Sequence, residues 1–139
     1  MIVVDSSAIL AGVDAAHVEH DRVTSITQRE PGPFLLSPFV AAEVDNMLAT
    51  RAGISQQVAF LRAVAEGEYS LQAFDADEIA EMAQLVDRYR DLGIGLADAS
   101  LVVLADRAGT KRVLTLDERH FRALRPLRGG SFTILPADA

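Results

Sequence analysis

The fold is decided by the stretch Met1-Ile2-Val3-Val4-Asp5-Ser6-Ser7. Its apolar run, which contains β-branched residues, predicts a short buried strand. The run stops at Asp5, and the next residues predict a helix over 6–13 with Ser6 as its N-cap. A strand that ends in an acid and passes straight into a helix places that acid at the carboxyl edge of a sheet, where open α/β folds bind ligands. Asp5 is therefore the first candidate site residue.

The composition is that of an ordinary globular protein, with 139 residues, 50% hydrophobic and 24% charged. This length predicts a single domain over residues 1–139. The chain has no Cys, which excludes disulfides and thiolate metal sites and fits a cytoplasmic protein. Neither a signal peptide nor a membrane-spanning run is expected. A net charge of −7 argues against binding nucleic acid by bulk electrostatics, so a phosphate-bearing partner needs a local basic patch or bound cations.

Short apolar strands alternate with helical segments along the chain. Further strands are predicted at 34–36, 69–74, 113–116 and 132–135. Further helices are predicted over 17–29, from the Ser37 N-cap to Arg51, after a Ser55 N-cap, from Asp75 through Tyr89, over 96–108 and over 118–124. This alternation implies parallel strands joined by helical crossovers. We therefore expect an α/β protein, a three-layer α/β/α sandwich with a central, mostly parallel β-sheet.

Four carboxylates occupy positions where an acid is locally unfavourable. Asp5 and Asp117 each follow a predicted strand, so in a parallel sheet both emerge at the same edge. Glu43 lies in the first turns of a largely apolar helix, and Asp98 lies in the first turn of the most apolar helix of the chain. Because the starts of such helices also face the carboxyl edge of the sheet, all four acids are expected to converge.

A cluster of ionised carboxylates requires a cation. Two carboxylates about 4 Å apart repel by about 4 kcal/mol at an effective dielectric constant of about 20. Hard divalent cations such as Mg²⁺ or Mn²⁺ take oxygen ligands and suit a site without Cys. Such an ion would activate water and neutralise the charge that develops on a phosphodiester under attack.

Each acid also has an ordinary structural explanation. Asp5 and Asp117 could be helix N-caps, and Asp98 could complement a helix dipole. Glu43 could be an exposed polar residue. Only the coincidence of all four acids favours a metal-binding site.

Four segments carry a resemblance to a known family. They are Val4-Asp5-Ser6-Ser7-Ala8, Glu43 within the helix that Ser37-Pro38 begins, Gly95-Leu96-Ala97-Asp98-Ala99, and Leu114-Thr115-Leu116-Asp117-Glu118-Arg119-His120-Phe121. With these segments the sequence resembles the PIN-domain ribonucleases over essentially its whole length. It looks most like the VapC-type toxins of bacterial toxin–antitoxin modules, so the resemblance implies a PIN-like fold.

The resemblance also implies roles for individual residues. In the family, the acids that match Asp5 and Asp98 are the usual metal ligands, and those that match Glu43 and Asp117 complete the acidic cluster directly or through water. Thr115 matches a hydroxyl position often found beside the fourth acid. We assign a supporting role to Thr115, and likewise to Ser7.

The function that the resemblance implies is a Mg²⁺-dependent endoribonuclease, with Mn²⁺ as the alternative ion, in which metal-activated water attacks an RNA phosphodiester in line. It further implies a homodimer and a protein antitoxin whose tail occupies the active-site groove. Two alternatives stay open. One is a non-catalytic Mg²⁺-binding α/β module for signalling or interaction, which would tolerate loss of Glu43. The other is a DNA-directed nuclease of the same fold.

A basic segment offers candidate RNA contacts. Residues 106–128 contain seven basic and three acidic residues, within a chain that is acidic overall. Arg119, Arg122 and Arg125 recur at every third position beside Asp117. We expect Arg119 and Arg122 to contact RNA, although a solvated helix face explains the same spacing.

The histidines give weaker signals. His17 and His20 are three residues apart, but nothing else in their segment completes a metal site, so both are expected to be surface polar residues. His120 is nearer the acids and could contact a phosphate, although a structural role explains it equally well.

Overall fold

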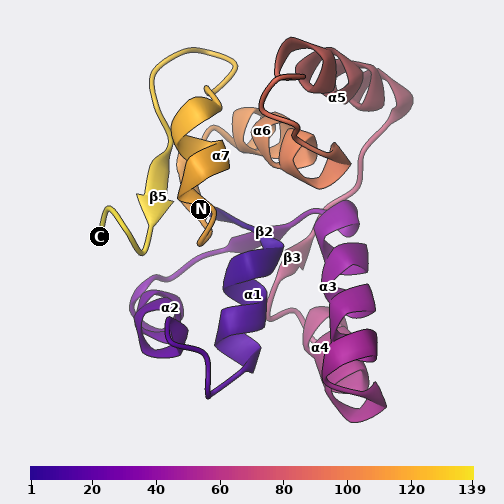
Figure 1. Ribbon diagram of the computed structural model, residues 1–139, viewed down its shortest axis with the longest axis vertical. Coiled ribbons are helices and arrows are strands. Elements are labelled where there is room, and N and C mark those ends of the chain that lie inside the picture. Colours follow the sequence, from indigo (N-terminus) through magenta and orange to yellow (C-terminus); the bar gives the residue numbers. More distant parts are fainter.

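The computed structural model describes all residues, 1–139, and is built on one five-stranded sheet (Figure 1). The strands are β1 (Ile2–Val4), β2 (Phe34–Leu36), β3 (Ser70–Leu71), β4 (Arg112–Leu114) and β5 (Thr133–Leu135). Their order is β3-β2-β1-β4-β5, and every neighbouring pair is parallel. The expected α/β class with a mostly parallel sheet is confirmed, and the sheet is in fact parallel throughout.

Helices cover both faces of this sheet. They are α1 (Ser6–Val13), α2 (His20–Arg29), α3 (Pro38–Arg51), α4 (Ile54–Ala65), α5 (Ala76–Arg88), α6 (Leu96–Ala108) and α7 (Glu118–Ala123). In Figure 1, α1, α2 and α4 lie below β2, α5 and α6 lie above it, α3 runs downward from the level of β2 and β3, and α7 lies beside β5. Within these layers α1 packs on α2, α3 on α4 and α5 on α6.

The first strand is central because it pairs with β2 on one side and with β4 on the other. Its residues Ile2, Val3 and Val4 are completely buried and belong to a single core cluster of 30 apolar residues. The carboxyl ends of β1, β2 and β4 therefore lie side by side at one edge of the sheet. None of the helices is both long and apolar enough to cross a membrane.

Several predicted boundaries are wrong for local reasons. The strand predicted at 113–116 spans Arg112–Leu114, although the Thr115 amide still donates a hydrogen bond to the Leu135 carbonyl of β5. The strand predicted at 69–74 is reduced to Ser70–Leu71, which lies at the edge of the sheet and pairs only with β2. The helix predicted over 17–29 begins at His20, and Val18 precedes it and is exposed.

Two predicted N-caps are also wrong. The N-cap position of α1 is held by Asp5, and Ser6 is already the first helical residue, because the strand runs into the helix with a single intervening residue. The N-cap of α4 is Gly53, whose φ of 97° is left-handed and therefore suited to glycine, and not Ser55. In contrast, the Ser37 hydroxyl caps α3 as predicted, by accepting a hydrogen bond from the Phe39 amide.

Candidate active site

A cleft of about 480 Å³ lies at the carboxyl edge of the sheet. Its walls come from the turn after β1, from α3, from the start of α6 and from the start of α7. Its polar lining consists of Asp5, Ser6, Ser7, Glu43, Asp98, Asp117 and His120. The structure therefore places all four acids singled out in the sequence around one cleft, although they are separated by up to 112 positions along the chain.

Asp5 is buried, with 5% of its surface exposed, and is held by hydroxyl groups. Its Oδ2 accepts a hydrogen bond of 2.7 Å from Thr115 Oγ1 and one of 3.0 Å from Ser7 Oγ. Although Asp5 has the N-cap position of α1, its side chain makes no capping hydrogen bond. Burial raises the pKa of the Asp5 carboxyl, and the bonds from Thr115 and Ser7 partly offset this rise.

Thr115 connects the end of β4 to the end of β1. Besides donating to Asp5, its Oγ1 accepts a hydrogen bond of 2.9 Å from the Asp117 amide and lies 3.2 Å from Ser7 Oγ. Ser7 Oγ in turn accepts a hydrogen bond of 2.9 Å from the Leu116 amide. These bonds fix the position of Asp5 relative to the chain segment that carries Asp117. Thr115, whose supporting role the resemblance implied, and Ser7, to which we assigned one, thus lie within one hydroxyl network around Asp5.

Asp98 lies in the first turn of α6, and 16% of its side chain is exposed. The pKa of Asp98 is raised to about 6, first by burial and then by the negative charge of Asp5. The charge of Asp117 raises this pKa further, and His120 lowers it. Ionised Asp98 is therefore costly in the folded protein unless a positively charged group is beside it.

His120 is in contact with two of the acids. Its Nδ1 lies 3.0 Å from Asp98 Oδ2 and 3.0 Å from Asp117 Oδ2. The Nδ1 atom is buried, yet neither oxygen is aligned for a hydrogen bond with it. The sequence offered one signal for this contact, since His120 follows Asp117 by three positions in a predicted helix and so lies on the same face.

Asp117 and Glu43 have further contacts of their own. Asp117 caps α7, because its Oδ1 accepts a hydrogen bond of 3.0 Å from the His120 amide. Its other carboxylate oxygen faces His120 Nδ1 in the cleft. Glu43 is exposed, and its Oε1 accepts a hydrogen bond from Ser6 Oγ. The contact between Ser6 and Glu43 was not expected, because no local pattern joins residues 37 positions apart.

The lining of the cleft has the chemistry of a site for a hard divalent cation. The carboxylate oxygens of its four acids are the ligands that Mg²⁺ and Mn²⁺ prefer. Burial first, and then neighbouring carboxylates, raise the pKa of Asp5 and Asp98, and a cation beside them would favour their ionised forms. The donor set therefore fits such an ion. Even so, no three of the acidic or imidazole groups lie close enough together to hold one ion. The acids surround the cleft without closing a ligand shell.

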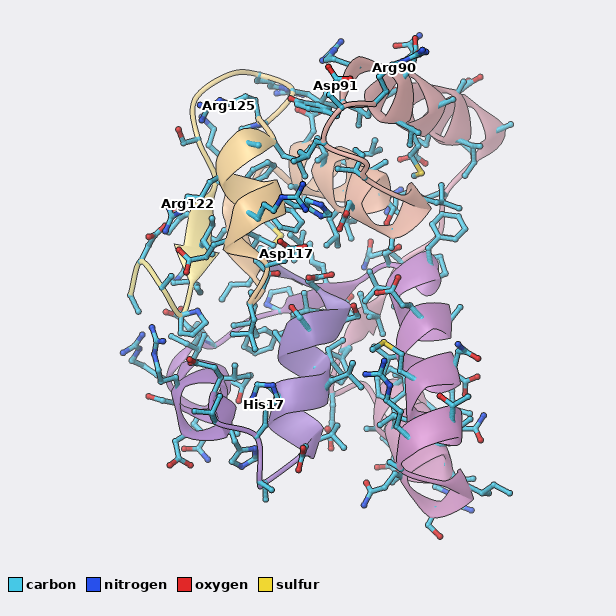
Figure 2. The ribbon with its side chains drawn as sticks, viewed as in Figure 1. His17, Arg90, Asp91, Asp117, Arg122 and Arg125 are labelled. Atoms are coloured by element: carbon cyan, nitrogen blue, oxygen red, sulfur yellow. The ribbon has the colours of Figure 1, made fainter.

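Four of the seven basic residues in the segment 106–128, Arg122 among them, have acidic partners. Arg122 lies on the β5 side of α7 (Figure 2) and contacts Asp138 at 2.6 Å and Glu118 at 3.0 Å. The remaining ion pairs of this segment are Arg107 with Glu78, Arg112 with Glu30, and Arg128 with Asp106. In contrast, Arg119 is exposed, has no acidic partner and directly precedes His120 in α7.

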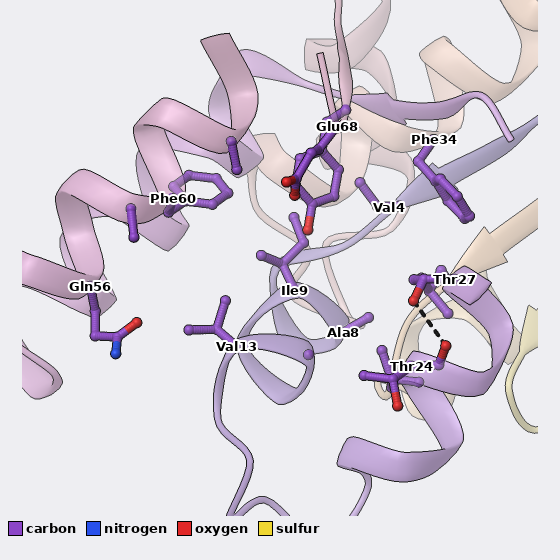
Figure 3. Close-up of a pocket in the computed structure, with 16 residues that line it drawn as sticks. Val4, Ala8, Ile9, Val13, Thr24, Thr27, Phe34, Gln56, Phe60 and Glu68 are labelled. Carbon is purple, nitrogen blue, oxygen red and sulfur yellow. Dashed lines mark hydrogen bonds between the residues drawn. The ribbon is translucent and has the colours of Figure 1, made fainter. Parts of the chain in front are cut away.

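Two further hollows lie beside the acidic cleft. One, of about 930 Å³, lies between α1 and α3 and shares Ser7 with the cleft. The other, of about 550 Å³, is lined mainly by apolar side chains of α1, α2 and α4 (Figure 3), and shares Val13 and Gln56 with the first. The three hollows therefore form a series of neighbouring depressions along α1.

Comparisons with known proteins agree on one family. The model of the PIN domain family matches residues 2–125. Among curated proteins, Ribonuclease VapC26 of Mycobacterium tuberculosis is 45% identical over 135 residues, which are 97% of this chain and 100% of that protein.

Solved structures share the fold at low sequence identity. VapC20 from Mycobacterium tuberculosis, described as a Sarcin-Ricin loop cleaving toxin, has a TM-score of 0.78 at 20% identity and covers 84% of this chain and 90% of its own. VapBC2 from Rickettsia felis, whose structure contains a DNA fragment from the promoter, has a TM-score of 0.65 at 14% identity. The match covers 96% of this chain and 97% of that one. FitAcB from Neisseria gonorrhoeae has a TM-score of 0.62 at 20% identity, with 87% and 91% covered.

Proposed function

Since the chain belongs to the PIN-domain family and, within it, to the VapC-type ribonucleases, we propose that it is a Mg²⁺-dependent endoribonuclease and the toxin of a toxin–antitoxin system. Mn²⁺ is the alternative ion. The observation that supports this proposal best is the gathering of Asp5, Glu43, Asp98 and Asp117 around one cleft at the carboxyl edge of the sheet. The substrate is RNA, and the reaction is hydrolysis of a phosphodiester bond.

In this proposal Asp5 and Asp98 hold the ion, and Glu43 and Asp117 complete its acidic surroundings directly or through water. A divalent cation bound there would activate water and neutralise charge on the phosphate. Thr115 and Ser7 keep the Asp5 carboxylate in one orientation by donating to its Oδ2. Preorganisation of this kind lowers the cost of assembling the site when substrate binds.

An RNA backbone must approach this acidic cleft in spite of the negative charge of the protein. Arg119 is the cation best placed to assist, because it is exposed and follows Asp117 by two positions. Arg122 is a weaker candidate, because Asp138 and Glu118 already neutralise its charge.

The test is cleavage of a panel of structured RNAs by the purified protein. We expect cleavage in Mg²⁺, no cleavage in EDTA, and no cleavage by Asp98→Asn in Mg²⁺. An exposed-acid variant, Asp77→Asn in α5, is the matched control and should cut like the wild type. DNA of the same sequences is a further arm. Cleavage of DNA alone would favour the DNA-directed alternative, and a folded wild type that cuts neither polymer would contradict the proposal.

We also propose a protein antitoxin as the partner, with its tail in the cleft. The supporting observation is the series of hollows that leads from the acids through the space between α1 and α3 to the apolar hollow of Figure 3. Ala59 is exposed in the wall of that apolar hollow, so Ala59→Asp should weaken inhibition by the antitoxin. If the antitoxin inhibits this variant and the wild type equally, it does not bind along this series of hollows.

A homodimer is the last part of the proposal. The exposed apolar side chains of Ile79, Val86 and Leu96 surround one shallow hollow at α5 and the start of α6, a surface suited to a second copy of the chain. Val86→Glu at this surface should convert the dimer to a monomer in sedimentation experiments. A dimer that survives the change uses another surface.

A further inference from the structure

The ring of His120 stands between two carboxylates of the cleft. The distances of 3.0 Å from Nδ1 to Asp98 Oδ2 and to Asp117 Oδ2 are those of close polar contacts. A hydrogen on Nδ1 would present a positively polarised atom to both acids, whereas a lone pair there would face their carboxylate oxygens and be repelled by them.

The backbone of His120 is held in place by its contacts, whereas its ring can rotate out of the cleft. The amide of His120 donates to Asp117 Oδ1, and the next residue, Phe121, is buried against Phe132 with their ring centroids 5.8 Å apart. In contrast, 18% of the His120 side chain is exposed, so a change of rotamer can take the ring toward solvent without moving α7. Since neither contact is an aligned hydrogen bond, such a change does not break a well-formed one.

The carboxylate oxygens that Nδ1 contacts are among the oxygens that a cation in this cleft would use. With the ring between them, no three groups of the cleft are close enough to hold one ion. We propose that the His120 ring and a divalent cation compete for Asp98 and Asp117, so that the ring holds the two carboxylates in the metal-free protein and turns away when the ion enters. This inference rests on the proposed function, because it takes the acids of the cleft as metal ligands.

An alternative role for His120, in which the ring positions the two acids for the ion, predicts the opposite change in metal affinity. If the ring only positioned the two acids for the ion, its removal would weaken metal binding. If the ring occupies the position that the ion needs, its removal strengthens metal binding. The sign of the change therefore separates competition from positioning.

The experiment is calorimetric titration of Mn²⁺ into the full-length protein without RNA. For His120→Ala we expect Mn²⁺ to bind about tenfold more tightly than to the wild type, the size expected when one contact to a charged group is removed. His120→Asn should bind nearly like the wild type, because its amide nitrogen is as many bonds from the backbone as Nδ1. His17→Ala is the control, because Figure 2 shows His17 at the far end of α1 from Asp117.

Thermal unfolding gives a second readout. Metal-free His120→Ala should melt below the wild type, because the repulsion between Asp98 and Asp117 is no longer offset, and Mn²⁺ should raise its Tm by more than that of the wild type. His120→Ser, which also removes the ring and leaves its volume open, should behave like His120→Ala and replaces it if that variant does not fold.

The outcomes separate this inference from the proposed function. Weaker or unchanged Mn²⁺ binding by His120→Ala and His120→Ser overturns the competition, while Mn²⁺ binding by the wild type that Asp98→Asn abolishes still supports the metal site. If the wild type binds no Mn²⁺ but His120→Ala does, the competition is supported in its strongest form. If no variant binds Mn²⁺, both the metal site and the competition are wrong.

Discussion

Thr115 Oγ1 donates a 2.7 Å hydrogen bond to Asp5 Oδ2, and both residues are buried. The bond joins the ends of β1 and β4, the two neighbouring strands whose last paired residues are Val4 and Leu114. The bond therefore links the end of one central strand to the carboxylate that the next one brings into the cleft.

Replacing Thr115 by Val should damage both stability and activity. The change keeps the shape of the side chain but deprives the buried Asp5 carboxylate and the Asp117 amide of a partner. We expect a loss of about 1–3 kcal/mol in the free energy of unfolding, measured by urea titration, and a fall in RNA cleavage of at least about tenfold. Thr115→Ser is the control that keeps the hydroxyl. Full activity of the Val variant would show that the Thr115 hydroxyl does not orient Asp5.

Asp98 should make the metal-free protein less stable as the pH rises. Its pKa is raised from 3.8 to about 6, mainly by burial and next by the charge of Asp5, so the folded state binds this proton more tightly than the unfolded state. The stability that the proton confers is fully present below pH 3.8 and is lost as the pH rises through about 6. Relative to Asp98→Asn, the Tm of the wild type should fall by about 2–4 °C between about pH 4 and about pH 7.5. If the Tm values of the two proteins change in parallel with pH, the raised pKa of Asp98 is contradicted.

Divalent cations should stabilise the folded protein. At neutral pH the ionised acids of the cleft repel one another, and an ion that binds only the folded state raises the Tm by mass action. We expect saturating Mg²⁺ to raise the Tm of the wild type by about 2–4 °C, and EDTA to reverse the change. Asp98→Asn should show a much smaller rise. An equal rise in both proteins would place the ion elsewhere.

The buried hydroxyls of Ser37 and Ser100 should be energetically coupled. Their Oγ atoms lie 2.7 Å apart, both residues are completely buried, and the bond joins the start of α3, which carries Glu43, to α6, which carries Asp98. Each single Ala variant leaves a buried hydroxyl with one partner fewer, at a cost of about 1–2 kcal/mol. The double variant should cost less than the sum of the two, as measured by urea unfolding. Strict additivity would mean that the two hydroxyls act independently.

The two candidate RNA-contacting arginines should differ. In an Asp98→Asn background, which blocks cleavage, Arg119→Glu should lower RNA affinity and reduce the salt dependence of binding by about one ion. Arg122→Glu should instead destabilise the carboxyl-terminal segment, because it replaces a cation that contacts Asp138 and Glu118 with an anion. Unchanged RNA binding by Arg119→Glu would remove this residue from the RNA interface.

The sequence predicts well the features that depend on neighbouring residues. The helix over 96–108 has the predicted bounds because Gly95 and Gly109 flank a largely apolar run. The Ser37-Pro38 start of α3 is likewise a local signal, read from two adjacent residues. The all-parallel sheet follows from the alternation of strands and helices along the chain.

The features that the sequence does not predict depend on partners far away in the chain. Nothing near Thr115 shows that its hydroxyl donates to Asp5, because the two residues are 110 positions apart. The two N-cap candidates, Asp5 and Asp117, have similar local sequences but different roles, since only Asp117 makes the capping bond. The contact of His120 with Asp98 depends on how α7 packs beside α6, which local patterns do not contain.

The central position of β1 has a consequence for how the protein is made. The cleft needs Asp5 from the first residues of the chain and Asp117 from the last quarter, and β1 lacks one of its two strand neighbours until β4 has been synthesised. A nascent chain therefore carries Asp5 early but cannot assemble the cleft until β4 and Asp117, 112 positions later, have been added.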